Sequence, residues 1–263
     1  MSIWEAILMG VVQGLTEFLP VSSSGYLEIA NVVLGIEAEQ NLAFTTVVHG
    51  GPGLSTIVVL WKYLGRVLSK FFTFKPGPEL RFGINILVSA LPILVVGMFF
   101  KDQVETLFTG NLLLVGVMLL VTAALLTFSQ YAKPRHREMN IRDAFVIGIA
   151  QAVAVLPGLS RSGSTIPTGL LLGLRREDVA SFSFLMALIP IIGANILEIT
   201  GGGFAEASAT IGAGALIAGF LASFLVGTLA CKLMINLVKR GKLIWFAVYC
   251  ALVWLVAVGY SLF

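Results

Sequence analysis

Two short polar segments carry the side chains of this sequence that can do chemistry in apolar surroundings. The first contains Glu17 and Ser23, and the second contains Arg161. A carboxylate can act as a general acid or base or bind a hard cation, and a serine hydroxyl can attack or hydrogen-bond a phosphate. An arginine fork binds phosphate and other oxyanions. The residue types therefore predict a site for a phosphate-bearing ligand.

The two segments belong to an internal repeat. Adding 138 to the residue number maps one stretch onto the other over more than forty residues, which chance composition does not explain. The matched pairs are Ala6 with Ala144, Gly10 with Gly148, Gln13 with Gln151, Leu34 with Leu172, Phe44 with Phe182 and Pro52 with Pro190. Glu17 and Ser23 instead align with Val155 and Arg161. Two related halves, about 1–131 and 143–263, are therefore expected to bring different groups to one site.

Composition excludes a soluble protein. Hydrophobic residues make up 57% of the chain, charged residues only 12%, and the mean hydropathy is +0.96. So few charges cannot cover the surface of a soluble domain of this length, which indicates a polytopic membrane protein. No polar stretch is long enough to fold alone, so residues 1–263 are expected to form one integral-membrane domain. Cys231 and Cys250 lie in apolar runs and are interpreted as small core residues.

The fold class predicted is all-α, with about six full spans and two re-entrant helical hairpins. The spans are expected at 44–61, 82–100, 111–131, 180–199, 209–235 and 244–262. Each approaches the roughly 20 residues needed to cross the hydrocarbon. Regions 4–36 and 143–173 are apolar but interrupted by Pro, Ser and Gly, and each half is too short to span. Irregular backbone at membrane depth is tolerated when it is buried in protein or lines a polar cavity.

The basic residues predict an orientation. Lys and Arg predominate in three connections and acidic residues are more frequent in three others, and basic loops stay in the cytoplasm. The basic connections are 62–81, 132–142 and 239–242, and the others are 37–43, 101–110 and 198–208. This assignment alternates through every predicted span, so the first hairpin enters from outside and the second from the cytoplasm. Two repeats of opposite topology with a site near the midplane are expected.

Arg161 is the cation placed at a broken tip. A charge at that depth costs about 2.5–3.5 kcal/mol and marks a functional site by default. The neighbouring hydroxyls are Ser160, Ser162, Ser164 and Thr165. With a helix starting there, they favour phosphate binding by Ser160, Ser162 and Thr165. The alternative is that Arg161 only pairs with Glu17 to hold the hairpins together, which would be a poor source of stability.

Gln13 and Glu17 are four residues apart and share a helix face. Their oxygens predict a site for a divalent cation, or Glu17 is a general base or acid. The serine run contains Ser22, Ser23 and Ser24, whose hydroxyls offer a nucleophile or hydrogen-bond donors to phosphate. Ser22 or Ser23 also suits a helix N-cap. His49 begins a span and is open to either a catalytic or a packing role.

The sequence resembles the bacterial undecaprenyl-pyrophosphate phosphatases, also called bacitracin-resistance proteins, over essentially its whole length. The resemblance rests on two long signatures, Gln13-Gly14-Leu15-Thr16-Glu17-Phe18-Leu19-Pro20-Val21-Ser22-Ser23-Ser24-Gly25 and Pro157-Gly158-Leu159-Ser160-Arg161-Ser162-Gly163-Ser164-Thr165. It implies Glu17, Ser23 and Arg161 as catalytic residues. It also implies a divalent cation, Mg²⁺ first and Ca²⁺ as the alternative, at Gln13 and Glu17.

The resemblance further implies the substrate and the setting. The substrate is a polyprenyl pyrophosphate lipid, cleaved to the monophosphate carrier and inorganic phosphate. That reaction recycles the carrier for cell-wall synthesis and confers bacitracin resistance. The expected partners are this lipid and the bilayer of the bacterial cytoplasmic membrane, with the site facing outside. Binding of nucleic acid is not expected, and a homodimer is left open.

Two positions depart from the family pattern. The family usually has His directly after the serine-rich run, and this sequence has Tyr26 there. The tyrosine hydroxyl can donate a hydrogen bond to phosphate, and its ordinary pKa is about 10. Gly50-Gly51-Pro52-Gly53 stands where the family is more apolar and helical, and we expect it to loosen or kink the span there.

Two other functions compete with the phosphatase. A flippase for polyprenyl phosphate lipids is the main alternative, because inverted repeats with broken helices are a transporter design. An anion channel is disfavoured, since one Arg with one Glu forms no ring of like charge.

Overall fold

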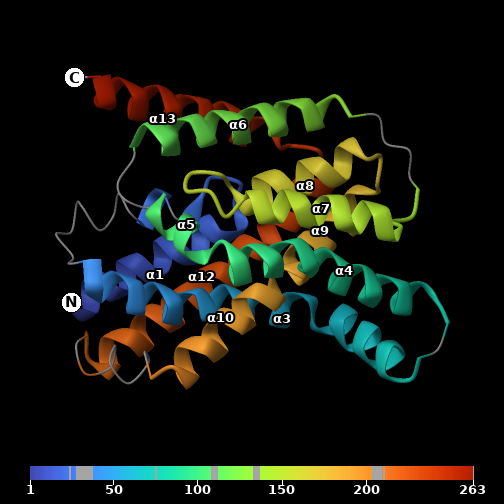
Figure 1. Ribbon diagram of the computed structural model, residues 1–263, viewed down its shortest axis with the longest axis horizontal. Helices are drawn as coiled ribbons and strands as arrows, with labels where there is room; N and C mark the ends of the chain where they lie inside the picture. Colours follow the sequence, from blue (N-terminus) through green and yellow to red (C-terminus); the bar gives the residue numbers. More distant parts are fainter. Residues whose placement is uncertain are drawn as a thin grey trace.

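The computed structural model describes residues 1–23, 25–27, 38–74, 76–107, 112–132, 137–202, 209 and 211–262. These residues are almost entirely helical, and the one pairing of β type among them is an isolated bridge between Arg137 and Leu174. Figure 1 shows α1 (Ile3–Phe18), α3 (Ala38–Phe72), α4 (Pro78–Phe99), α5 (Lys101–Thr106), α6 (Leu112–Gln130), α7 (Ile141–Val153), α8 (Arg161–Leu171), α9 (Arg176–Met186), α10 (Leu188–Thr200), α12 (Ala213–Lys239) and α13 (Ile244–Leu262).

The long apolar helices confirm the membrane class. Five stretches among the described residues are long and apolar enough to cross a bilayer: Phe44–Phe72, Pro78–Phe99, Leu113–Gln130, Arg176–Leu197 and Ala213–Lys239. α13 supplies the sixth predicted span, of which Ile244–Leu255 is described in full. Large apolar side chains such as Leu91, Leu197 and Leu229 remain exposed on the outside of the bundle. Exposed leucines of this kind suit contact with lipid.

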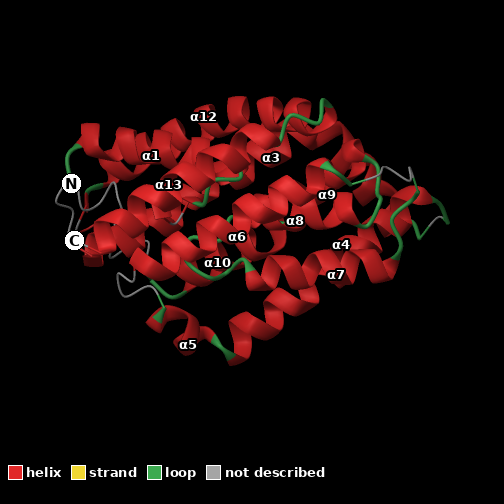
Figure 2. Cartoon of the chain, turned by 90° about the horizontal axis from the view of Figure 1, so that it is seen from above, coloured by secondary structure: helices red, strands yellow, loops and turns green. Residues whose placement is uncertain are grey.

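The helices lie mainly along the long axis of the molecule, so most connections gather at its two ends (Figures 1 and 2). Both termini and α5 lie at one end, and the turn between α3 and α4 lies at the other. α1 begins at the first of these ends and α7 at the opposite one (Figure 1). The first helices of the two predicted hairpins therefore begin at opposite ends of the bundle, and which end faces the cytoplasm stays a prediction.

The second interrupted segment is divided as predicted. α7 begins at an Asn140 capping box with Asp143 and ends at Val153, and α8 runs back beside it from Arg161. Seven residues, 154–160, form the non-helical tip between them. In the first segment α1 ends at Phe18 and a short helical turn includes Ser23, while residues 28–36 of the predicted second half lie outside the described residues.

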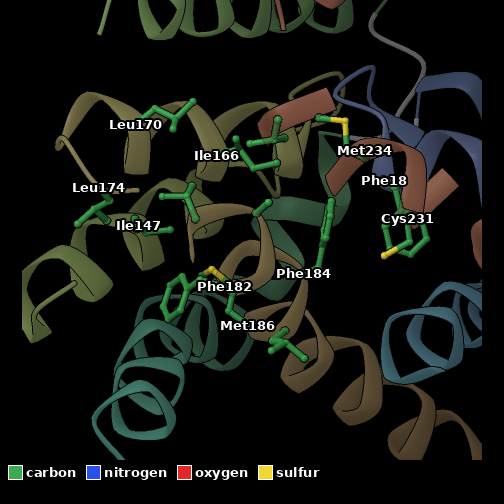
Figure 3. Packing of buried hydrophobic residues seen from close by; sticks show 14 of the residues in the cluster. Phe18, Ile147, Ile166, Leu170, Leu174, Phe182, Phe184, Met186, Cys231 and Met234 are labelled. Atoms are coloured by element: carbon green, nitrogen blue, oxygen red, sulfur yellow. The ribbon is translucent and has the colours of Figure 1, made fainter. Parts of the chain in front are cut away.

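One large apolar cluster joins the second hairpin to α1, α9 and α12 (Figure 3). Phe18 lies one residue beyond Glu17 and meets Phe184 edge-on, with ring centroids 5.2 Å apart. Met234 and Cys231 of α12 pack in the same cluster. Both cysteines are fully buried and free, as the sequence indicated. The cluster holds α1 against α9 next to Glu17.

Two predicted spans that contain proline have different outcomes. The glycine-proline cluster 50–53 lies inside a continuous helix, because α3 runs from Ala38 to Phe72 with Pro52 inside it. The span predicted at 180–199 instead divides at Ala187 into α9 and α10, three residues before Pro190. Proline lacks the N–H that a continuous helix would use, which agrees with a break in this region.

Candidate active site

The two broken segments meet at a cavity of about 190 Å³. Its lining residues are Thr16, Glu17, Ser22, Ser23, His49, Ala154, Val155, Leu159, Ser160 and Arg161. The 138-residue offset relates eight of these as four pairs: Thr16 with Ala154, Glu17 with Val155, Ser22 with Ser160, and Ser23 with Arg161. Repeat-related positions thus face one shared cavity, and the polar groups in it differ between the two copies.

Glu17 is the centre of the polar network. Its side chain is 8% exposed, and its Oε1 accepts a hydrogen bond of 2.5 Å from Nη2 of Arg161. Its Oε2 accepts from Nε2 of Gln13 at 3.0 Å and from Oγ of Ser23 at 3.1 Å. Nε2 of His49 lies 3.4 Å from the same oxygen. A carboxylate buried to this extent needs such partners, because an unpaired buried charge is strongly disfavoured.

Arg161 is held by the start of α8 and by α9. Ser160 caps α8, and its Oγ accepts from the backbone N–H of Gly163 at 3.1 Å. Nη1 of Arg161 donates to the backbone oxygen of Ser183 at 3.3 Å, while Nη2 reaches Glu17. Both Ser160 and Arg161 line the cavity, so the N-terminus of α8 opens onto it. A helix N-terminus beside an arginine fork favours the binding of an oxyanion.

Irregular backbone shapes both tips. Ser22 has a φ of +69°, a left-handed conformation that is uncommon for residues other than glycine. Gly158 has a φ of +88°, and a Cβ there would lie 2.5 Å from the backbone oxygen of Val115 in α6. Oγ1 of Thr122, also in α6, accepts from the backbone N–H of Ser160 at 3.2 Å. α6 therefore fixes the tip that carries Arg161.

His49 belongs to the cavity. Its Nδ1 lies 3.1 Å from the backbone oxygen of Thr45, one turn earlier in α3, and this contact turns Nε2 towards Glu17. Its side chain is 31% exposed, so the ring is open to the cavity. The sequence left His49 open between packing and catalysis, and the structure places it in direct contact with the carboxylate.

The other residues predicted to bind phosphate divide into two groups. Ser22 and Ser160 line the cavity. Ser162 and Thr165 lie behind it in α8, where Oγ of Ser162 is 3.4 Å from Oγ of Ser160. Oγ1 of Thr165 is 2.6 Å from Oγ of Ser183. These two hydroxyls support the tip, and Ser24 lies outside the described residues.

Tyr26 is not among the residues that line the cavity. Its ring stacks on Tyr249 of α13, with the centroids 6.3 Å apart and the planes 16° from parallel. The two hydroxyls are in hydrogen-bond contact. The residue that replaces the family His is therefore turned towards α13.

Three polar residues of the site were not singled out from the sequence: Thr16, Thr122 and Ser183. The repeat held a signal for Ser183, because the offset maps it onto Thr45. The backbone oxygen of Thr45 contacts His49, and the backbone oxygen of Ser183 accepts a hydrogen bond from Arg161. Thr122 lies outside both signatures, and its role depends on how α6 packs against the tip.

The residues around Glu17 fit a cation that arrives with a phosphate ligand. No group of three His, Cys, Asp or Glu side chains is close enough to hold a metal anywhere in the described part of the chain. Oε1 of Gln13, however, is buried and makes no hydrogen bond to a described residue. One carboxylate, one amide oxygen and nearby hydroxyls are hard donors, and Mg²⁺ commonly combines one or two carboxylates with substrate phosphates.

Fold and site together define a multi-pass, all-helical membrane protein with an oxyanion-binding cavity between two broken helical segments. The chain belongs to the family described as bacitracin resistance protein BacA, whose sequence model matches residues 6–256.

Curated relatives match almost end to end. The undecaprenyl-diphosphatase of Bacteroides fragilis strain YCH46 is 55% identical, with 98% of each chain covered. The undecaprenyl-diphosphatase of Parabacteroides distasonis is 54% identical over 100% of this chain and 99% of its own. That of Christiangramia forsetii is 47% identical, with 99% of each covered.

Proposed function

We propose that this protein hydrolyses undecaprenyl diphosphate to undecaprenyl phosphate and inorganic phosphate. The observation that carries the proposal is the contact of Glu17 with both Ser23 and Arg161 at one cavity. Glu17 can serve as the base, Ser23 offers a hydroxyl, and Arg161 can bind the phosphate oxygens, and these are groups that catalyse phosphate cleavage. The names of the full-length relatives support the same activity.

The substrate diphosphate would take over part of the hydrogen bonding that Glu17 now receives. Arg161 is 18% exposed, and its fork can turn from the carboxylate towards phosphate oxygens. The start of α8 and the hydroxyls of Ser22 and Ser160 would complete the phosphate site. Charge that develops on these oxygens in the transition state would be stabilised by groups already in place, which is the main source of catalysis in phosphoryl transfer.

Two routes are consistent with the contacts of Glu17. In the first, Oγ of Ser23 attacks the terminal phosphorus while Glu17 accepts its proton, and the bond to the bridging oxygen breaks. The lipid monophosphate leaves, and water then hydrolyses the phosphoserine. In the second, Glu17 activates a water that attacks directly, and Ser23 only donates a hydrogen bond. Ser23 lies 3.1 Å from Glu17, a distance that serves either route.

A divalent cation, Mg²⁺ or Ca²⁺, belongs to this proposal. Oε1 of Gln13 and the carboxylate of Glu17 would hold it together with substrate oxygens. It would supply neutralisation of the phosphate charge. His49 would position Glu17 through the contact at Oε2, with its ring fixed by Thr45.

The proposed setting is the bacterial cytoplasmic membrane, with the cavity open to the outside. There the reaction would recycle the lipid carrier of cell-wall synthesis and confer bacitracin resistance. The family name and the multi-pass fold support this setting.

Phosphate release by the purified protein tests the proposal. Detergent-solubilised protein with undecaprenyl diphosphate and Mg²⁺ is expected to release one phosphate per lipid, and the matched Ser23→Ala variant is expected to release it much more slowly by either route. Absence of release from folded protein, with lipid transfer across a vesicle membrane, would favour the flippase and contradict the proposal.

A further inference from the structure

A second concave region lies on the membrane face of the bundle, between α4 and α7. These helices pack side by side (Figure 2), and they lie close together at Gly148, where a Cβ would lie 2.4 Å from the backbone oxygen of Ser89. Beside this contact the helices border an apolar groove of about 370 Å³. Its walls include Leu91, Pro92 and Val95 of α4 and Phe145, Ile149 and Val153 of α7.

The linings of the groove and of the proposed active site are adjacent along the chain. Ala152 and Val153 belong to its wall, and the next two residues along the chain, Ala154 and Val155, line the polar cavity. Neighbouring Cα atoms are about 3.8 Å apart, so the same short stretch separates an apolar surface from a phosphate-binding one. From Val153 back to Phe145, the groove follows α7 for roughly 12 Å.

The two surfaces match the two parts of one molecule. A polyprenyl diphosphate carries a multiply charged head and a long branched hydrocarbon chain, which must leave the cavity at the depth of the tips. The groove offers that chain an apolar wall immediately beside the cavity. Because lipid tails are as apolar as the groove, its advantage over bulk lipid must come from packing and orientation of the chain.

We propose that the groove between α4 and α7 holds the first isoprene units of the polyprenyl chain and thereby positions the diphosphate in the cavity. This inference rests on the proposed function, since it assigns the chain of the same substrate. Ile149 and Val95, on opposite walls, are the residues that would contact the chain.

Tryptophan substitutions that fill the groove provide the first test. Ile149→Trp and Val95→Trp place a bulky ring in it from α7 and from α4. The matched controls are Val146→Trp and Leu94→Trp, which change residues of 41% and 46% exposure on the same helices outside the groove wall. Each variant is assayed with undecaprenyl diphosphate and with isopentenyl diphosphate, whose single isoprene unit ends near the cavity.

The two groove variants are expected to raise KM for undecaprenyl diphosphate at least fivefold and to change the kinetics with isopentenyl diphosphate less than twofold. The two control variants are not expected to raise KM for undecaprenyl diphosphate in this way. An equal loss with both substrates, or an equal effect of groove and control variants, would overturn the proposal. Hydrolysis of isopentenyl diphosphate by the parent protein reports on the proposed activity separately.

A binding test is independent of turnover. A benzophenone amino acid introduced at position 149 is expected to crosslink to undecaprenyl diphosphate in vesicles, seen as the mass of the adduct, and one at position 146 is not. Equal crosslinking at both positions, or adducts with bulk phospholipid only, would show that the groove holds ordinary membrane lipid and would contradict the proposal.

Discussion

A single carboxylate organises the site at the scale of residues. Glu17 receives hydrogen bonds from Gln13 of α1, from Ser23 and from Arg161 at the start of α8, and it also contacts α3 through His49. Among the described residues, Arg161 is the one permanently charged side chain that contacts this carboxylate. Any change at Arg161 is therefore expected to alter both the proposed phosphate binding and the stability of a buried ion pair.

Arg161→Lys should separate these two effects. Lysine keeps a positive charge for Glu17, but it loses the planar fork that reaches Glu17 and the backbone of Ser183 together. We expect kcat to fall at least 10²-fold, the loss typical of removing one electrostatic donor, while the detergent melting temperature changes little. Steady-state phosphate release and thermal denaturation measure the two quantities. Near-parental turnover in this variant would exclude Arg161 from the phosphate site.

Glu17→Gln keeps the size of the side chain and removes its charge. The amide cannot accept a proton from Ser23 or water, and it binds a cation weakly, so activity is expected to fall at least 10²-fold. Titration of the residual activity with Mg²⁺ is the informative measurement. A shift of the Mg²⁺ midpoint to higher concentration supports the cation site, and an unchanged midpoint leaves Glu17 as base alone.

Tyr26 should tolerate substitution. Its ring and hydroxyl contact Tyr249 and do not line the cavity. Tyr26→Phe is therefore expected to change kcat less than threefold, and Tyr26→His less than tenfold. Measurement of kcat for the three side chains decides this, and a rise of 10²-fold in the His variant would show that the position takes part in proton transfer.

At the scale of elements, the non-helical tips determine where Arg161 lies. Gly158→Ala should disturb the second tip, since φ is +88° and the new Cβ would meet the backbone of Val115. A displacement of about 1 Å can cost a factor of 10² in rate, so we expect a loss of kcat of at least tenfold. Gly97→Ala in α4, where no atom lies within 4 Å of the added Cβ, is the control and should remain fully active. Equal activities of the two variants would contradict a role for the tip.

The elements also show what sequence could predict. Apolar runs predicted the spans, and the Pro, Ser and Gly residues predicted that the segment 143–173 is divided into two short helices, because hydrophobic length and helix breaks are local properties. The turn of Tyr26 towards α13 was not predicted. It depends on packing between helices far apart in the sequence, and so do the roles of Thr122 and Ser183.

At the scale of the whole molecule, the two ends should face opposite sides of the membrane. Lys70 is near the end of α3 and Asp102 is in α5, at the other end of the bundle (Figure 1). A cysteine at Asp102 is expected to react with an impermeant maleimide in intact cells, and one at Lys70 only after lysis. Cys231 and Cys250 are fully buried, so the background should be low. Labelling of both positions from one side would contradict the prediction that the two ends of the bundle face opposite sides of the membrane.

The four repeat-related pairs around the cavity have a consequence for the origin of the protein. If single repeats had assembled as a homodimer, every substitution would have appeared twice, since symmetry places the same residue in both copies. Such a dimer would carry Glu17 twice or not at all, and the same holds for Arg161. A cavity with one Glu17 and one Arg161 therefore requires two copies that differ in sequence, so duplication of the repeat preceded the division of labour between the copies.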